Sequence, residues 1–490
     1  MKLISKILLC QLALLFTANL SAQFVQQGNK LVGTGNVGEC AQGYRVAVSA
    51  DGNTILMGGN TDNSNQGAAW VFTRTGSTWT QQGNKLVGTG NVDAAFQGGA
   101  IALSADGNTA LIGGTFDNGS QGAAWVFTRT GTTWTQQGTK LVGTGSVGKA
   151  EQGTAVALSA DGNTALVGGT ADNTYQGATW VFTRTGNTWM QQGTKLVGTG
   201  SVGSAEQGGA VKLSADGNTA LVGGTADNSS RGAAWVFTRS GSIWTQQDAK
   251  LVGTGSIGSA RQGYDVALST DGNTALSGAL ADNSNAGAVW VFKRTGNTWA
   301  QQGSKLVGTG NAGTAGQGRS VALSANGNMA LVGGSGDNNF AGAAWVFART
   351  GETWAQQGSK LVGTGNVGNA LQGFSVALSG SGNTALIGGY LDNSFRGATW
   401  VFFNPSVSTK DIALSDKVKI YPSVSTGNLT IEGAQTVEVV NTTGQVVHTS
   451  TFEKGSTTQR LDLSHLPNGL YLLKGRDTEG VRYVQKLVKQ

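Results

Sequence analysis

One 55-residue unit repeats seven times along this 490-residue chain. Each unit contains a Trp-Val-Phe triplet, and the tryptophan that opens the triplet recurs every 55 residues without an insertion. These residues are Trp70, Trp125, Trp180, Trp235, Trp290, Trp345 and Trp400. A second series lies nine residues behind the first six, at Trp79, Trp134, Trp189, Trp244, Trp299 and Trp354. A long fixed period indicates a solenoid, a propeller or an array, in which each repeat is one supersecondary unit.

Within the unit 153–207, the pattern is that of four antiparallel strands. Residues 156–159 and 164–169 are apolar segments on either side of an Ala-Asp-Gly-Asn turn, which indicates a hairpin. Residues 178–184 and a segment running from Trp189 towards Gly198 flank a Thr-Gly-Asn-Thr turn, which indicates a second hairpin. Four antiparallel strands per repeat are typical of a propeller blade. No helix is expected.

The two ends of the array are complementary. The last unit stops after its Trp400-Val401-Phe402 strand, whereas residues 24–31 form an unattached copy of the fourth strand at the N-terminal end. This N-terminal strand can complete the last blade, and ring closure removes the exposed sheet edges of an open array. The sequence therefore predicts an all-β fold, with a seven-bladed β-propeller of four-stranded blades over residues 23–405, closed by the N-terminal strand.

The first 22 residues have the pattern of a secretory signal peptide. Lys2 and Lys6 precede an apolar run over residues 7–16, and small residues end at Ala22, where cleavage is expected. No second apolar stretch is long enough to span a membrane. After cleavage Cys40 is the one remaining cysteine, so no internal disulfide is predicted.

The predicted propeller lacks the residue types on which most catalytic sites depend. The two histidines, His448 and His465, both follow the repeats, so the propeller contains no Ser-His-Asp or Cys-His arrangement and no conventional zinc site. A pair of carboxylates remains the alternative for catalysis. The net charge of +6 is mild and spread through the repeats, whereas nucleic-acid binding favours a clustered basic stripe. We therefore predict no enzyme and no nucleic-acid partner.

The blade motifs resemble the FG-GAP family, the blade type of integrin α-subunit propellers. The resemblance is carried over residues 24–405 by Gln-Gly-x-x-Val-Ala-Leu-Ser, by Asp-Gly-Asn-Thr-Ala-Leu-Val-Gly-Gly and by Trp-Val-Phe-Thr-Arg-Thr-Gly. Calcium-binding members carry alternating acidic ligands before the turn glycine, but Ser159 and Ala157 stand at those places before Asp161. One carboxylate per loop is far from the six to eight oxygens that calcium takes. No metal or cofactor is therefore predicted, with calcium in the turns as the alternative.

Two recurring residue types admit a structural and a functional interpretation. The tryptophans are expected to pack between blades, and the alternative is a set of exposed platforms for sugars. An Asp-Asn pair recurs at Asp62, Asp117, Asp172, Asp227, Asp282, Asp337 and Asp392. We expect these aspartates to form Asx-turns that satisfy loop amides, and the alternative is a ring of carboxylates that attracts cations.

Variation between repeats is concentrated in two loops. The strands hardly change, but the residues around the recurring Gln-Gly and after the Asp-Asn pair do. Loops on one face of a rigid scaffold commonly carry binding residues, and we expect both loops on one face. The candidate ligand residues are Phe96, Glu151, Tyr175, Glu206, Arg231, Arg261, Tyr264, Asp265, Arg319, Phe340, Phe395 and Arg396. Tyr44, Arg45 and Phe374 vary in the same way. The alternative is drift at solvent-exposed positions.

After a linker at residues 406–415, the chain changes character. Residues 416–490 alternate apolar positions with Asn and Gly turns, which predicts a β-sandwich of about seven short strands. The segments Val418-Lys419-Ile420-Tyr421-Pro422 and Leu466-Pro467-Asn468-Gly469-Leu470-Tyr471 resemble the type A C-terminal sorting domain of the type IX secretion system. This resemblance implies that the domain binds the secretion machinery of a Gram-negative bacterium. It also implies that the protein is released or held at the outer cell surface after removal of the domain.

These observations together predict a secreted or cell-surface binding or adhesion protein that presents one propeller face to a protein or a glycan. The alternatives are a secreted polysaccharide-active enzyme, a multivalent lectin, and a structural surface component without a specific ligand.

Overall fold

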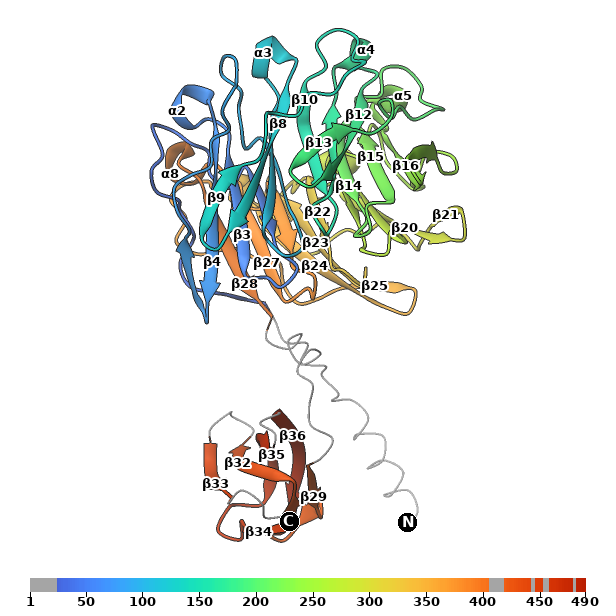
Figure 1. Ribbon diagram of the computed structural model, residues 1–490. Helices are drawn as coiled ribbons and strands as arrows, with labels where there is room; N and C mark the ends of the chain where they lie inside the picture. Colours follow the sequence, from blue (N-terminus) through green and yellow to red (C-terminus); the bar gives the residue numbers. More distant parts are fainter. Residues whose placement is uncertain (1–23, 405–417, 442–445, 453–457, 479–481) are drawn as a thin grey trace, which may run out of the picture. The chain divides into compact units, whose positions relative to one another are not determined.

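The computed structural model describes residues 24–404, 418–441, 446–452, 458–478 and 482–490 (Figure 1). The chain divides into two compact units, Met1–Ser406 and Val407–Gln490. The predicted signal peptide and the predicted linker lie outside the described residues.

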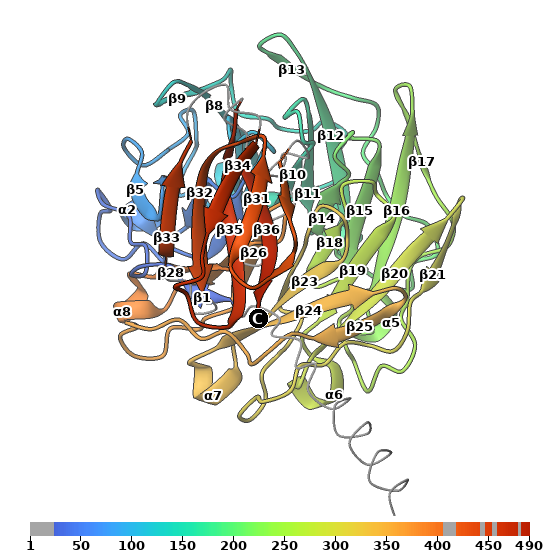
Figure 2. The same ribbon diagram turned by 90° about the horizontal axis from the view of Figure 1, so that it is seen from below.

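The first unit is built from seven four-stranded antiparallel sheets, as the repeat predicts. In each sheet the strands are hydrogen-bonded in chain order, and Figure 2 shows one such series, β14 to β17, side by side. The first four blades are β2 (Arg45–Val48), β3 (Thr54–Gly59), β4 (Ala68–Thr75) and β5 (Thr78–Gln81); β6 (Ala100–Leu103), β7 (Thr109–Gly114), β8 (Ala123–Thr130) and β9 (Thr133–Gln136); β10 (Gln152–Leu158), β11 (Thr164–Gly169), β12 (Ala178–Thr185) and β13 (Thr188–Gln191); and β14 (Gln207–Leu213), β15 (Thr219–Gly224), β16 (Ala233–Ser240) and β17 (Ile243–Gln246). The other three are β18 (Val266–Leu268), β19 (Thr274–Ala279), β20 (Ala288–Thr295) and β21 (Thr298–Gln301); β22 (Ser320–Leu323), β23 (Met329–Gly334), β24 (Ala343–Thr350) and β25 (Thr353–Gln356); and β26 (Ser375–Leu378), β27 (Thr384–Gly389) and β28 (Ala398–Phe403) with β1 (Val25–Gln26).

The fourth strand of each blade is shorter than the sequence predicts. In the third blade β13 ends at Gln191, because Gly193 turns the chain with a φ of 71°. The backbone returns to the blade at Leu196, which exchanges two hydrogen bonds with Thr179 of β12. The segment that was expected to prolong the strand is therefore not part of a continuous ladder: it contacts β12 through the amide of Gln192, which donates to the carbonyl of Val181, and through one isolated bridge at Leu196.

The ring closes in the predicted way. β1 pairs with β28, with Val25 opposite Phe403 and Gln26 opposite Phe402. A second set of contacts also closes the ring. The turns between the first and second strands of the blades are joined by seven backbone hydrogen bonds of 2.9–3.0 Å, each from one blade to the next. The last of them runs from the amide of Gly380 to the carbonyl of Ala50 and completes the circle.

The tryptophans of the first series form the contacts between blades. All seven are fully buried, and each indole Nε1 donates to a backbone carbonyl, as Trp180 does to Thr144 at 2.8 Å. The cluster around Trp180 and Phe182 also contains Leu111 and Val126 of the preceding blade. In the second series Trp189 is partly buried, donates to Gln137 Oε1, and lies beneath the guanidinium of Arg184. The prediction of core packing is therefore confirmed for the first series, and the second is also engaged in structural contacts.

The Asp-Asn segments fold as single left-handed turns, although no helix was expected. They are α2 (Asp62–Asn65), α3 (Asp117–Ser120), α4 (Asp172–Tyr175), α5 (Asp227–Ser230), α6 (Asp282–Asn285), α7 (Asp337–Phe340) and α8 (Asp392–Phe395). The second, third and fourth residues of each turn have positive φ angles, and the Asn that leads them is one of the few residue types that tolerates this conformation.

Each turn aspartate is buried in an ion pair rather than closing its own turn. Asp62 is 1% exposed, and its Oδ1 accepts a hydrogen bond from the amide of Val37 at 2.8 Å. Its Oδ2 is bound by the ammonium group of Lys85. The same pairing recurs in all seven blades. The alternative of a cation-attracting ring is therefore wrong, since a lysine already neutralises each carboxylate.

The second unit is a β-sandwich of two sheets. A three-stranded sheet is ordered β29-β31-β34, and a five-stranded sheet is ordered β30-β36-β35-β32-β33. Its strands are β29 (Lys419–Tyr421), β30 (Val424–Ser425), β31 (Asn428–Glu432), β32 (Ala434–Asn441), β33 (Val446–Thr451), β34 (Thr458–Asp462), β35 (Gly469–Asp477) and β36 (Arg482–Lys489). Leu429 and Ile431 of one sheet share a core with Val437, Val439 and Leu473 of the other.

Cys40 is expected to be unreactive in the folded protein. Its side chain is fully buried, and burial raises the pKa of the thiol to about 11. Because the thiolate is the nucleophile, alkylation by iodoacetamide at pH 8 should be at least about tenfold slower in the native protein than in urea. Equal rates, followed by mass spectrometry, would contradict this burial. Alanine occupies the equivalent position in the other six blades, so Cys40→Ala supplies the unreactive control.

Candidate functional site

The two variable loops lie on one face of the propeller, which we call the loop face. It carries the left-handed turns and the segments that connect each blade to the next, and α2, α3, α4 and α5 are seen at the top of the ring in Figure 1. The two loops of neighbouring blades are joined by parallel bridges, such as Gly67 with Gln97 and Gly122 with Gln152. The predicted convergence of the variable positions on one surface is therefore present in the structure.

The sevenfold repetition fails at the inner edge of this face. The position after the Gln-Gly pair is occupied by small residues in three consecutive blades, Gly99, Thr154 and Gly209. In the remaining four blades it is occupied by Tyr264, Arg319, Phe374 and Tyr44. Large side chains therefore fill one half of the channel mouth and leave the other half hollow.

The large residues form a packed group that we call the mouth cluster: Tyr44, Arg45, Tyr264, Asp265, Arg319, Phe374 and Tyr390. The guanidinium carbon of Arg319 lies 3.7 Å from the ring centroid of Phe374, and its Nη1 donates to the hydroxyl of Tyr264 at 3.0 Å. The ring of Phe374 in turn meets Tyr44 and Tyr390 at centroid distances of 4.9 and 4.4 Å. Stacked cation and aromatic contacts of this kind hold side chains in fixed positions.

Burial and hydrogen bonding set the chemistry of this cluster. Burial raises the pKa of Tyr390. The carboxylate of Asp265 accepts hydrogen bonds from the amides of Val266 at 2.9 Å and Val321 at 2.8 Å. Asp265 is thus held as a structural acceptor between β18 and β22.

The hollow half of the mouth is a cavity of about 340 Å³, which we call the mouth cavity. Tyr44 and Tyr264 of the mouth cluster line it, together with Phe96 and Phe116, whose ring centroids are 4.9 Å from each other. Its polar groups are Arg45, Asn60, Thr115, Glu151, Thr154 and Thr225. The volume lies within the range of about 300–1,000 Å³ that is typical of small-ligand sites.

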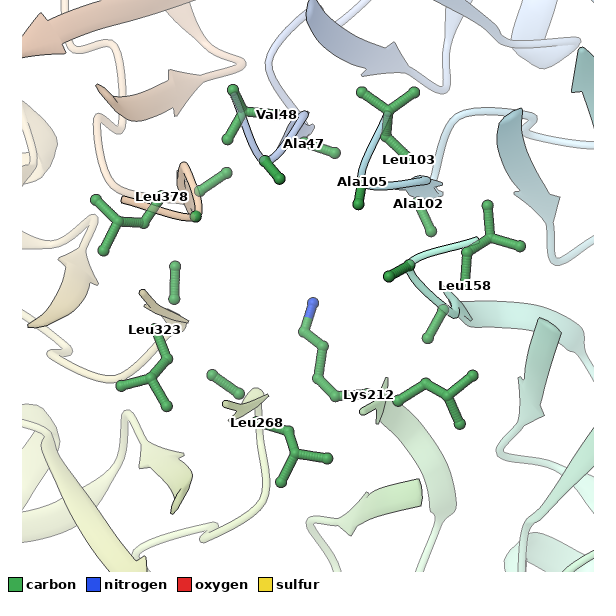
Figure 3. Close-up of a pocket in the computed structure, with 18 of the residues that line it drawn as sticks. Ala47, Val48, Ala102, Leu103, Ala105, Leu158, Lys212, Leu268, Leu323 and Leu378 are labelled. Atoms are coloured by element: carbon green, nitrogen blue, oxygen red, sulfur yellow. The ribbon is translucent and has the colours of Figure 1, made fainter. Parts of the chain in front are cut away.

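The mouth cavity continues inward. A narrower cavity of about 80 Å³ shares Arg45, Thr154, Gly209 and Tyr264 with it and reaches Lys212. Lys212 also lines the central channel, a cavity of about 290 Å³ between the innermost strands of the blades. Figure 3 shows the side chain of Lys212 extending into the middle of this channel, surrounded by alanine, valine and leucine side chains.

Half of the candidate ligand residues meet at or beside these cavities. Phe96, Glu151 and Tyr264 line the mouth cavity, and Asp265 and Arg319 line the narrower one. Glu206 lies just behind the wall, where its Oε2 accepts a hydrogen bond from Thr225 Oγ1 at 2.8 Å.

The other half lie apart from the mouth on the outer part of the loop face. Tyr175, Phe340 and Phe395 are exposed on α4, α7 and α8, and Phe395 reaches the mouth cluster only through Tyr390, at a centroid distance of 6.2 Å. The three arginines in this set are exposed next to these turns or in the inter-blade loops: Arg231, Arg261 and Arg396.

Sequence reasoning missed four residues that depart from their repeat position at the site, besides the small residues and threonines that line the mouth cavity. Asn60, Phe116 and Tyr390 follow the Gly-Gly pair of their blades, and Lys212 replaces an alanine of the inner strand. The signal was present in the alignment of the repeats, because each of them departs from the residue that prevails at its position. The alignment of the repeats does not show which residues of different repeats lie close together. Only closure of the ring brings residues of distant repeats to one opening.

Carboxylates in the turns of the opposite face are used internally. Asp161 Oδ1 accepts hydrogen bonds from Ser159 Oγ and from the amide of Asn163. Burial alone would raise the pKa of Asp161, but these hydrogen bonds outweigh it and lower the pKa. No group of three or more His, Cys, Asp or Glu side chains suited to a metal ion occurs among the described residues.

Comparison with known proteins identifies the C-terminal unit. Residues 419–490 match the secretion system C-terminal sorting domain family. No curated protein matches the chain. The match indicates export through the type IX secretion system, with the secretion machinery as a partner and the cell exterior or cell surface as the destination. In the parts of the chain that the structure describes, none of the helices has the length and apolar character needed to cross a membrane.

Proposed function

We propose that this protein is a non-enzymatic binding protein that presents the loop face of its propeller to a protein or glycan outside the cell. The observation that carries this proposal is the one-sided mouth cavity. Gly99, Thr154 and Gly209 leave space in three adjacent blades while the mouth cluster fills the rest. A rigid ring that departs from its own repeat at one opening has the character of a preformed binding site.

The proposal includes the route and the destination. An N-terminal signal peptide takes the chain across the inner membrane of a Gram-negative bacterium, and the C-terminal domain then directs it through the outer membrane. The mature propeller is released or attached at the cell surface as an adhesion or binding module. Its blades are of the FG-GAP type, which is common in surface proteins.

Filling the mouth cavity should abolish ligand binding without unfolding the blade. Gly209 has no positive φ, and a Cβ added there would meet its nearest atom, Thr170 Cγ2, at 3.4 Å. Gly209→Tyr places at this position the residue that the next blade has in Tyr264. We expect binding at least about tenfold weaker, measured on a glycan array and in cell-surface pull-downs with the full-length protein.

The matched control is Thr132→Tyr, which adds the same ring to an exposed turn between β8 and β9 on the opposite face. It should bind like the unchanged protein. A protein that binds neither glycans nor cell-surface proteins, but hydrolyses a member of a polysaccharide panel, would overturn the proposal in favour of an enzyme. In that case Glu151→Gln should remove the hydrolysis.

A further inference from the structure

The narrow inner cavity carries an excess of positive charge. Arg45, Lys212 and Arg319 line it, with Asp265 as its one carboxylate among the described residues. Asp265 accepts hydrogen bonds from two backbone amides. Arg319 donates to the hydroxyl of Tyr264 and lies against the ring of Phe374, while its buried Nε has no partner among the described residues. None of the three cations forms an ion pair with a described carboxylate, so the cavity offers positive charge to a ligand, and Arg45 and Lys212 carry it from the mouth to the channel.

Lys212 is the more informative of the two. The other six blades have alanine at this position: Ala47, Ala102, Ala157, Ala267, Ala322 and Ala377. Its side chain forms no hydrogen bond or ion pair with any described residue, and the surrounding walls are mostly apolar. Lys212 is exposed to the solvent of the channel, and an ammonium group without a partner attracts an anion that enters the channel.

Arg45 lies on the path from the mouth to Lys212. Its guanidinium donates to the carbonyl of Tyr44 at 3.1 Å and lies 5.1 Å from the centroid of the Tyr44 ring. This is its one hydrogen bond with the part of the chain that the structure describes, so the remaining donors of the guanidinium are free. Arg45 lines both the mouth cavity and the inner cavity, and can therefore guide an anion from one to the other.

The outer part of the site has a different character. Tyr44, Tyr264 and Phe96 supply aromatic surfaces, while Glu151 and Asn60 supply acceptors. The amide oxygen of Asn60 has no hydrogen-bond partner in the described structure, and Glu151 accepts one hydrogen bond, from Thr170 Oγ1. Aromatic rings beside hydrogen-bond acceptors suit a sugar. The C–H face of the sugar packs on the aromatic ring, and the sugar hydroxyls donate hydrogen bonds to the acceptors.

We infer that the mouth cavity binds the end of an acidic oligosaccharide, with its carboxylate or sulfate group directed inward to Arg45 and Lys212. The inner cavity of about 80 Å³ accommodates the anionic group, and the mouth cavity of about 340 Å³ accommodates the sugar ring that carries it. This inference rests on the proposed binding function and specifies the ligand class for the same site.

The test is titration of the full-length protein with oligosaccharides of one length: a hexuronate oligomer, a sulfated oligomer and a neutral oligomer. We expect at least one acidic oligomer to bind more tightly than the neutral one, and to bind more weakly as salt rises. Lys212→Ala should weaken acidic binding by at least about tenfold, as expected for a lost charged hydrogen bond, and leave neutral binding unchanged. This variant restores the residue found in the other six blades, so folding should be preserved.

Two further variants make the result specific. Lys419→Ala removes the same charge from an exposed strand position of the C-terminal sandwich and should bind like the unchanged protein. Adding Ala157→Lys to Lys212→Ala moves the ammonium group to the adjacent blade of the same channel and should restore part of the affinity.

Equal binding of acidic and neutral oligomers, or an unaffected Lys212→Ala variant, would overturn the inference. Binding of acidic peptides in place of sugars would do so as well. If Gly209→Tyr still abolished binding of the ligand found, the proposed binding function would stand although the acidic-sugar inference had failed. If array and pull-down gave no ligand at all, both would fall.

Discussion

Replacing Lys30 with methionine is expected to lower the free energy of unfolding of the propeller by about 3–5 kcal/mol, the usual effect of leaving a buried charge without its partner. Lys30 binds the carboxylate of Asp392, whose side chain is 1% exposed. Methionine keeps most of the length and apolar surface of the lysine stem, so the loss comes mainly from the uncompensated carboxylate. The measurement is the urea concentration at the midpoint of unfolding, followed by tryptophan fluorescence.

Lys30 differs from the other six lysines that pair with turn aspartates, because its ion pair joins two segments that are far apart in the sequence. Lys195 and Asp172 are 23 residues apart, whereas Lys30 and Asp392 are 362 residues apart. Besides the short pairing of β1 with β28, this ion pair attaches the N-terminal segment to the last blade. Lys30→Met should therefore speed hydrogen exchange in β26, β27 and β28, while Lys195→Met should lower stability similarly without affecting the seventh blade.

A double variant separates the lost ion pair from lost packing. In Lys30→Met/Asp392→Asn the charge is gone, but the amide oxygen of asparagine still accepts the hydrogen bond that the amide of Val367 donates to Asp392. Most of the stability should return. If Lys30→Met alone unfolded at the same urea concentration as the unchanged protein, the ion pair would have no part in holding the ring closed.

The architecture was accessible from the sequence because it follows from local patterns that repeat. The 55-residue period and the unattached strand at Phe24–Leu31 predicted the blades and their closure, and both are present. The lengths of β13 and its counterparts were not predicted, since a single glycine such as Gly193 ends the ladder there. The left-handed turns were also missed, because single-residue tolerance of positive φ does not reveal that three residues in succession adopt it.

The site was accessible only in part. Lysine recurs in every repeat at Lys30, Lys85, Lys140, Lys195, Lys250, Lys305 and Lys360. Six of these lysines pair with the turn aspartate 23 residues before them, so this pairing was present in the sequence as a constant offset. Six of the seven mouth-cluster residues stand out in the sequence as variable positions, but the sequence does not show that they touch. Arg319 meets Phe374 and Tyr264 from neighbouring blades, and these contacts depend on the radius of the ring. Variation between repeats marked the face that carries the mouth cavity, but it did not distinguish the mouth from the outer turns that carry Tyr175 or Arg231.

Substituting Gly143 with alanine is expected to lower the free energy of unfolding by about 2–3 kcal/mol, at the upper end of the usual range for overpacking a core. A Cβ at Gly143 would lie 2.0 Å from Cδ1 of Trp180. The indole cannot move aside, because Trp180 is fully buried and donates a hydrogen bond to the carbonyl of Thr144. Gly143 belongs to the segment that leaves the second blade, whereas Trp180 belongs to the third, so the contact joins consecutive blades.

The matched control is Gly209→Ala, where the nearest atom to the added Cβ is 3.4 Å away and the backbone is not in the left-handed region. Its urea midpoint should change little. Equal stability of the two variants would show that the close approach of glycine to tryptophan does not fix the spacing between blades. The same glycine recurs in every repeat, at 2.0–2.3 Å from the Cδ1 of its tryptophan. A requirement at this contact would explain why the Leu-Val-Gly-Thr-Gly stretch around this glycine is the same in every repeat, while the later part of each inter-blade segment and the channel mouth, which hold no such contact, differ from blade to blade.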